Sequence, residues 1–141
     1  MWYNSIMTWL LRSPLHFAVS SNVLALSYTG RNSGRRYTIP VNYVAAGDRL
    51  LVTSTPARTW WRNLRGGQQV SLRLRGRDVA ATAEVLEGEA VAPALANYFR
   101  GAPHMAKHFE VQMLNGEPDA ADVARVAPTR VMVVLQPQDA D

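Results

Sequence analysis

Residues 22–55 read NVLALSYTGRNSGRRYTIPVNYVAAGDRLLVTST and contain three runs typical of β-strands. The runs 22–29, 36–46 and 49–55 are rich in Leu, Val, Ile, Tyr and Thr, and short turns containing Gly, Asn, Ser or Asp separate them. Pro40 cannot donate a hydrogen bond to a β-ladder, so it marks an edge strand or a bulge. This stretch therefore predicts consecutive antiparallel strands joined by tight turns.

The rest of the chain adds strands and short helices around these three runs. Residues 69–88 predict a hairpin that turns at Arg75-Gly76, and residues 129–137 predict a late strand. Helical spacing and boundary residues predict helices over 3–12, about 59–65, 89–100 and about 103–114. The expected fold class is mostly β with peripheral helices: one domain over residues 1–141, built as a small barrel of about six antiparallel strands.

Composition narrows the classes of protein and of site. The 141 residues are 48% hydrophobic, which is enough for a packed core, and they include no cysteine. Disulfides, thiolate catalysis and zinc–thiolate sites are therefore excluded. No uninterrupted apolar run approaches the ~20 residues of a membrane span, and the N-terminus lacks the basic start of a signal peptide. We expect a cytoplasmic protein.

Positive charge gathers in one half of the sequence. Residues 31–77 contain ten arginines and a single acid, Asp48, whereas the residues after Arg77 contain ten acids and four bases. Such a basic half favours an anionic ligand.

The turn GRNSGRR at residues 30–36 is the most basic point of that half. A turn of small residues leaves backbone N–H groups free to surround an anion, and flanking guanidinium groups add bidentate donors. Arg31, Ser33 and Arg35 would then converge on one phosphate-like group. An exposed hairpin tip carrying arginines for solubility is the alternative, and the residues alone leave both interpretations open.

Two adjacent tryptophans stand in RTWWRNLR at residues 58–65. Neighbouring positions of a helix point in different directions, so only one indole can lie at the centre of the core-facing side. The other lies at the rim or lines a cleft, where it could stack on a planar ring. The sequence does not distinguish between Trp60 and Trp61.

Catalytic and metal-binding patterns are sparse. His104 and His108 would share a helix face, but a third ligand is missing and His16 is remote, so we predict no metal site. No nucleophile motif and no paired carboxylates in the basic half are present, and an enzyme of this sequence would take its reactive centre from a cofactor. A nucleic-acid-binding barrel remains a minor alternative, because no strand carries interleaved exposed aromatic and basic residues.

The order of these features resembles the deazaflavin-dependent nitroreductase family, also called the nitroreductase/quinone reductase family. The similarity rests on T-G-R-x-S-G-x-x-x-x-x-P at 29–40, the Gly47-Asp48 hairpin, W-x-x-N-L at 60–64 and the hairpin at 69–88. It covers residues 5–90 well and the late strand loosely.

The resemblance implies a split β-barrel of the flavin-reductase type that binds coenzyme F-420, a deazaflavin with a phospholactyl-oligoglutamate tail. It implies hydride transfer from the reduced cofactor to a nitro compound, a quinone or an activated alkene. The cofactor-binding residues that it implies, from the tail to the ring and the loop that closes over it, are Arg31, Asn32, Ser33, Gly34, Arg35, Arg36, Pro40, Asn42, Ser54, Thr55, Arg58, Thr59 and Trp60.

The chain departs from the family at two positions of the turn region. Asn32 stands where the family commonly has lysine, and Tyr37 replaces a further basic residue. FMN therefore stays open as the cofactor, and so does a non-catalytic split-barrel module that binds FMN, haem or lipid.

The predicted N-terminal helical segment, residues 1–20, would pack on or cap the barrel. Trp9 and Phe17 of this segment, with His104 and His108, are the candidates for a substrate pocket. The segment could equally contact a membrane surface. The expected partner is a small-molecule substrate rather than nucleic acid, and related split barrels often form homodimers.

Overall fold

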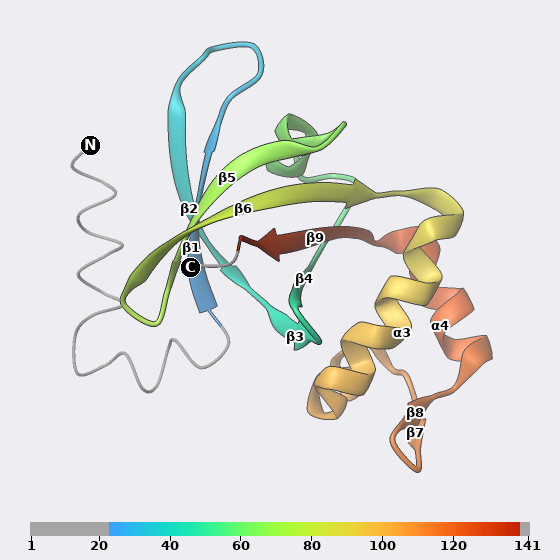
Figure 1. Cartoon of the computed structure of the whole chain (residues 1–141). Helices are drawn as coiled ribbons and strands as arrows, with labels where there is room; N and C mark the ends of the chain where they lie inside the picture. Colours follow the sequence, from blue (N-terminus) through green and yellow to red (C-terminus); the bar gives the residue numbers. More distant parts are fainter. Residues whose placement is uncertain (1–22, 139–141) are drawn as a thin grey trace.

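The computed structural model describes residues 23–138, which form a curled antiparallel sheet with helices gathered at one end (Figure 1). The strands of this sheet are β1 (Val23–Thr29), β2 (Arg36–Asn42), β3 (Val44–Ala46), β4 (Arg49–Ser54), β5 (Gln68–Leu74), β6 (Arg77–Leu86) and β9 (Val131–Pro137). A separate two-stranded hairpin consists of β7 (Met113–Leu114) and β8 (Glu117–Pro118). The α-helices are α3 (Val91–Gly101) and α4 (Ala120–Val126), and the 3₁₀-helices are η1 (Trp60–Leu64), η2 (Gly88–Ala90), η3 (Pro103–Phe109) and η4 (Ala127–Thr129).

The sheet has the strand order β2-β1-β5-β6-β9-β4-β3, with every neighbouring pair antiparallel. The predicted strand 36–46 is therefore two strands at opposite edges of one sheet, divided at Tyr43, and the sheet has one strand more than expected. Because β2 and β3 follow each other in the chain, this segment links the two edges of the curled sheet. Pro40 lies on the edge strand β2, as its missing N–H predicts.

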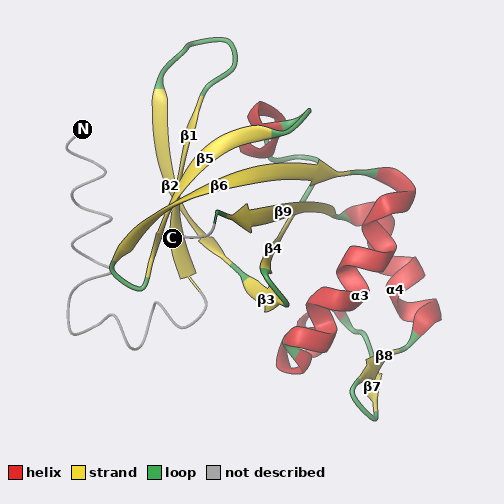
Figure 2. Ribbon diagram, in the orientation of Figure 1, coloured by secondary structure: helices red, strands yellow, loops and turns green. Residues whose placement is uncertain are grey.

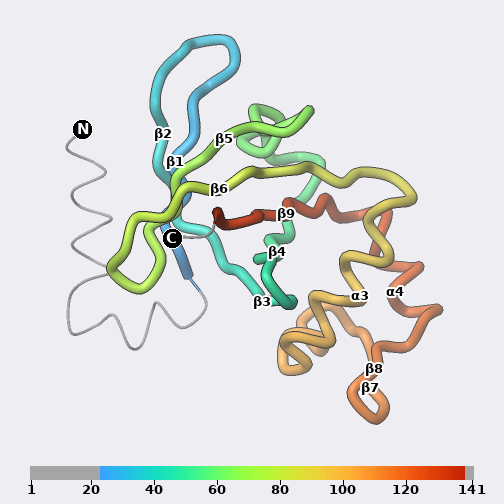
Figure 3. Tube along the Cα trace, in the orientation of Figure 1, coloured from blue at the N-terminus to red at the C-terminus, as the bar shows by residue number. Residues whose placement is uncertain are grey.

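Strand β9 contributes to both cores of the sheet. It lies between β6 and β4 (Figures 2 and 3), and its side chains alternate between the two faces of the sheet. Val133 and Leu135 pack inside the curl with Trp61, whereas Met132 and Val134 pack against α3. Burial on both faces gives a continuous apolar strand instead of an alternating one.

The helices differ from the sequence predictions at two places and agree at a third. The helix expected over 103–114 ends at Phe109, because Glu110 adopts a left-handed conformation with φ of 56°, and the chain continues into β7. Helix α4 was not predicted, although Asp119 caps it by accepting a hydrogen bond from the Asp122 N–H at 3.0 Å. The helix expected over 59–65 is present as the 3₁₀-helix η1.

The predicted helix 3–12 and the candidates Trp9 and Phe17 lie outside the described residues. Within residues 23–138, no helix combines the length and the apolar character needed to cross a membrane.

Candidate functional site

A cavity of about 410 Å³ opens between the sheet and the helical end, a volume typical of small-molecule sites. One side, here called the strand wall, consists of residues from β2, β4, the loop after β4 and η1: Pro40, Asn42, Ser54, Thr55, Arg58 and Trp60. A second part of the lining, here called the helix wall, consists of residues from α3, η3 and the position directly before β9: Tyr98, Met105, Phe109 and Arg130. Val41, Val52 and Thr53 complete the lining.

All six residues of the strand wall are among the cofactor-binding positions that the resemblance implies: Pro40 and Asn42 along the ring, and Ser54, Thr55, Arg58 and Trp60 in the loop that closes over it. They come from chain segments that only the fold brings together. Thr59 does not line the cavity but stands directly before η1.

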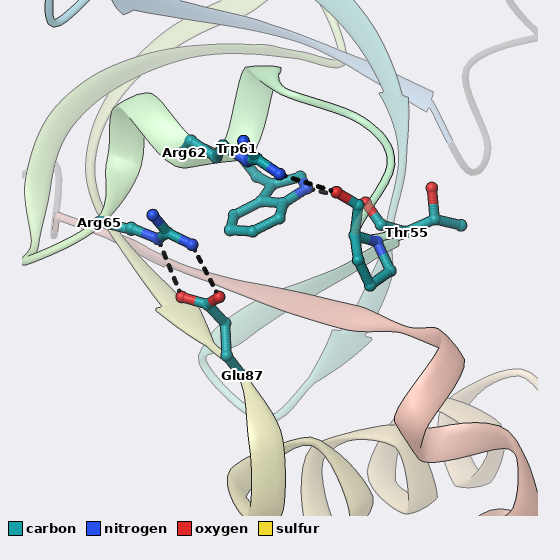
Figure 4. Close-up of polar contacts among 6 residues, drawn as sticks. Thr55, Trp61, Arg62, Arg65 and Glu87 are labelled. Atoms are coloured by element: carbon teal, nitrogen blue, oxygen red, sulfur yellow. Dashed lines mark hydrogen bonds and ion pairs between the residues drawn. The ribbon is translucent and has the colours of Figure 1, made fainter.

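The two tryptophans of η1 have the two separate roles that the sequence predicts. Trp61 is 1% exposed and donates its indole N–H to the Thr55 carbonyl at 2.9 Å (Figure 4). The guanidinium groups of Arg62 and Arg65 lie 5.4 and 4.9 Å from its ring centroid. Trp60 is half-buried and lines the cavity, which places an indole at the cleft.

Asn63 joins η1 to the arginine-rich turn. Its Oδ1 accepts a hydrogen bond from the Arg31 backbone N–H at 2.9 Å, and its Nδ2 donates to the Trp60 carbonyl at 3.0 Å. The Arg31 guanidinium also donates to the Arg65 carbonyl. The Asn of W-x-x-N-L therefore holds the turn against the same short helix that supplies Trp60 to the cavity.

Fewer backbone donors of the turn are free than the sequence suggested. The N–H of Gly30 donates to the Arg35 carbonyl at 2.7 Å, and the N–H of Gly34 donates to the Gly30 carbonyl at 2.9 Å. The Arg35 N–H donates to Ser33 Oγ at 3.1 Å. Because the Arg31 N–H is also engaged, an anion at this turn would depend mainly on side-chain donors.

Three aromatic rings run from the turn to the cavity. Tyr37 stacks on Tyr28 with ring centroids 5.6 Å apart, and Tyr28 lies 6.5 Å from Trp60. A Cβ at Gly30 would lie 2.7 Å from both Ser33 Oγ and the Tyr37 ring, so this row requires glycine there. The turn and the cavity are thus connected by packing as well as by η1.

An ion pair ties the end of η1 to the end of β6 (Figure 4). Arg65 donates to both carboxylate oxygens of Glu87, at 3.0 and 2.9 Å. The hydrogen bond from Arg65 lowers the pKa of Glu87, although partial desolvation opposes this shift. The pair is about half exposed, so it adds orientation more than stability.

Arg130 is the polar centre of the helix wall. Its Nε donates to Thr53 Oγ1 at 3.0 Å, and its guanidinium lies 5.0 Å from the centroid of the Phe109 ring. Burial lowers the pKa of Arg130, and burial raises the pKa of the neighbouring Tyr98, an effect that the charge of Arg130 opposes. This wall therefore combines a partly desolvated cation with a hydroxyl that stays protonated at neutral pH.

None of the four helix-wall residues was predicted from the sequence as a site residue. His104 and His108 are exposed on η3, whereas Met105 and Phe109 of the same helix face the cavity. Met105 and Phe109 have the same four-residue spacing as the two histidines, so the spacing alone does not say which pair faces the cavity. The described residues include no group of three His, Asp or Glu side chains placed to hold a metal ion.

Solved structures with similar folds are known at low sequence identity. A putative pyridoxamine 5'-phosphate oxidase from Listeria innocua is 13% identical, with a TM-score of 0.54 over 88% of this chain and 91% of that one. A pyridoxinephosphate-oxidase-family protein from Clostridium acetobutylicum is 10% identical (TM-score 0.52; 92% and 84% covered), and a domain-swapped dimer is 18% identical (0.51; 80% and 79%). These structures show the split-barrel fold expected from the sequence.

The sequence itself matches a family model. No curated protein matches the chain, but the model of the F420H(2)-dependent quinone reductases matches residues 15–114, well over half of its length. This chain therefore belongs to the F420H(2)-dependent quinone reductase family.

Proposed function

We propose that this protein binds F-420 in the cavity and reduces a small planar acceptor, such as a quinone, a nitro compound or an activated alkene. The observation that carries the proposal is the strand wall. Six positions expected along a deazaflavin ring or in the loop that closes over it line one cavity, and the basic turn at 30–36 is hydrogen-bonded to η1 beside it. The family match supports the choice of cofactor.

The strand wall suits a flat heterocycle with polar edges. Pro40 and the Trp60 indole offer apolar surfaces, while Asn42, Ser54 and Thr55 offer hydrogen-bonding groups. When bound, the reduced deazaflavin supplies the hydride. The protein's part is to orient the ring against the acceptor and to keep water out, which explains why the chain carries no nucleophile motif.

The arginine-rich turn suits the anionic tail. Within the described residues the Arg35 guanidinium makes no hydrogen bond or ion pair, and it lies exposed at the tip. Guanidinium groups bind phosphate and carboxylate oxygens in bidentate geometry. The turn would therefore hold the phosphate and glutamates while the ring lies in the cavity.

A titration of F-420 against FMN tests the cofactor. We expect quenching of tryptophan fluorescence by F-420 at micromolar concentrations, weaker binding of FMN, and oxidation of reduced F-420 when menadione is added. Absence of F-420 binding would refute the proposal. Tight binding of FMN or haem without turnover would instead favour a non-catalytic binding module.

The tail site has its own test. A substitution of Arg31 would not isolate tail binding, because Arg31 also makes hydrogen bonds to Asn63 and Arg65. The informative variant is Arg35→Ala. Arg77→Ala, at another exposed arginine, is the control of equal charge change. We expect Arg35→Ala to weaken F-420 about 10-fold and a tail-less deazaflavin hardly at all, because one charge-assisted contact is lost. Equal loss for both ligands would remove the tail-binding role.

We also propose that the protein forms a homodimer, since one similar structure is a domain-swapped dimer. Light scattering coupled to size-exclusion chromatography would give the mass directly. A monomeric mass at micromolar concentration would contradict this part of the proposal.

A further inference from the structure

The helix wall contains a cation without a carboxylate partner. Ion pairs within residues 23–138 involve four other arginines: Arg65, Arg73, Arg100 and Arg125. Arg130 is partly buried, yet the one hydrogen bond of its side chain in this part of the chain is the bond from Nε to Thr53. Its two Nη groups are therefore donors that remain available at the cavity.

A second donor lies beside this cation. Tyr98 is 2% exposed and lines the cavity, and its hydroxyl forms no hydrogen bond with any other described residue. The ring is fixed by edge-to-face packing on Phe99, with centroids 5.7 Å apart. A held hydroxyl and a held guanidinium thus face the same space.

The donor atoms of Arg130 and Tyr98 are not among the fully buried side-chain atoms without a partner, so they stay open to the cavity. A partly desolvated cation gains most from a negative partner in the same environment. An oxygen that becomes negative during a reaction provides that partner.

We propose that Arg130 and Tyr98 form the acceptor subsite, which binds the carbonyl, quinone or nitro oxygen of the molecule being reduced. This inference rests on the proposed function for the direction of hydride transfer. As the hydride adds to the acceptor, its electron pair displaces charge onto that oxygen. The guanidinium then offsets the negative charge, the Tyr98 hydroxyl donates a hydrogen bond, and a solvent proton completes the two-electron reduction.

The neighbouring contacts position the subsite. Thr53 Oγ1 accepts from Nε, so the Nη edge of the guanidinium is the edge left for a ligand. Phe109 lies against the guanidinium, and Met105 adds an apolar surface for a planar ring. The strand wall is left for the cofactor, which allows both molecules to occupy one cavity.

The test compares an oxygen-bearing probe with a matched hydrocarbon. Menadione and 2-methylnaphthalene are titrated into the F-420-loaded protein and into the protein without cofactor, and tryptophan fluorescence reports binding. The variants are Arg130→Met and Tyr98→Phe, which keep most of the side-chain volume, with Arg77→Met as a remote arginine control. Thermal unfolding establishes that each variant is folded.

We expect each variant to weaken menadione about 10-fold or more, the effect of losing a strong hydrogen-bond donor, and to leave 2-methylnaphthalene unchanged. Arg130→Lys should recover part of the affinity because it keeps the charge. The dissociation constant of F-420 should stay within about 2-fold in all variants, since none touches the strand wall.

Two results would overturn the subsite. Unchanged menadione binding in folded Arg130→Met and Tyr98→Phe would remove it, and so would a loss of F-420 affinity that equals the loss for menadione. Failure of the wild-type protein to bind F-420 would refute the proposed function instead. The menadione and hydrocarbon titrations without cofactor would still decide whether Arg130 and Tyr98 bind an oxygen.

Discussion

The strand wall and the helix wall face the same cavity but are built in different ways. The strand wall draws its residues from one stretch of the chain, residues 40–60, which includes the motif positions Pro40 and Trp60. The helix wall draws single residues from α3, η3 and the position directly before β9, over residues 98–130. Motif positions within one stretch can be recognised in a sequence, whereas the helix wall is recognised only from the fold.

The chemistry of the two walls differs as well. The strand wall offers flat surfaces, neutral polar groups and the exposed Arg58 beside a basic turn, which suits a ring with an anionic tail. The helix wall has one partly desolvated arginine and one hydroxyl in an apolar surround. Variants of the strand wall should therefore affect the cofactor, and variants of the helix wall should affect the acceptor.

The largest expected effect is that of Trp61→Ala. Trp61 packs in the core under η1, and replacing a buried tryptophan by alanine costs about 3–5 kcal/mol. We expect a large decrease in the urea midpoint and loss of F-420 binding, because η1 loses its support. Retention of both stability and F-420 affinity would contradict the role of η1 as the support of the strand wall.

The next effects come from a matched pair, Trp60→Leu and Phe109→Leu. Both residues are partly buried aromatics at the cavity, one on each wall. Loss of an aromatic stacking contact corresponds to a change of up to about 10-fold in affinity. Trp60→Leu should raise the F-420 dissociation constant, and Phe109→Leu should raise the KM for menadione. If both variants weakened binding of the same ligand, the two walls would form a single binding site.

A smaller effect is expected for Thr53→Val. The substitution removes the oxygen that accepts from Arg130 Nε while keeping the side-chain shape. Because the guanidinium loses its fixed orientation, we expect the KM for menadione to rise about 3-fold, equivalent to a hydrogen bond at the weak end of the usual range. F-420 binding, measured in parallel, should not change, and an equal loss for both ligands would place Thr53 in the cofactor site.

The smallest effect concerns the ion pair between Arg65 and Glu87. The hydrogen bond from Arg65 lowers the folded-state pKa of Glu87 below its ordinary value of 4.5. Its contribution to stability is therefore present at neutral pH and is lost as the pH falls through the folded-state pKa. Glu87→Gln should reduce the urea midpoint slightly at pH 7 and by less at pH 3. An equal reduction at both pH values would mean that packing, not charge, explains the effect.

Much of the fold followed from local signals. The hairpin turn at Arg75-Gly76, where both residues have positive φ, and the edge position of Pro40 were predicted correctly. The division of residues 36–46 was not predicted, because an apolar strand pattern does not say which neighbour each half pairs with. Its two halves pair with β1 and β4, contacts that only the curled sheet defines.

The resemblance named the residues that line the strand wall, and their role in binding a cofactor stays a prediction. Arg130 gave only a weak signal, as a single arginine before an apolar strand in the acidic half. Its importance comes from burial beside Phe109 and Tyr98, which depends on packing between α3, η3 and β9. His104 and His108 were candidates for a pocket, but Met105 and Phe109, each one residue further along η3, line the cavity instead. A helical spacing alone does not say which side of the helix faces the sheet.

The central claim is that one cavity holds the cofactor on the strand wall and leaves the helix wall to the acceptor. A crystal structure of the protein with bound F-420 tests it most directly. We predict the ring against Trp60 and Pro40, the tail along the turn at 30–36, and open space in front of Arg130 and Tyr98. A ring bound against Arg130 and Tyr98, or outside this cavity, would contradict the account.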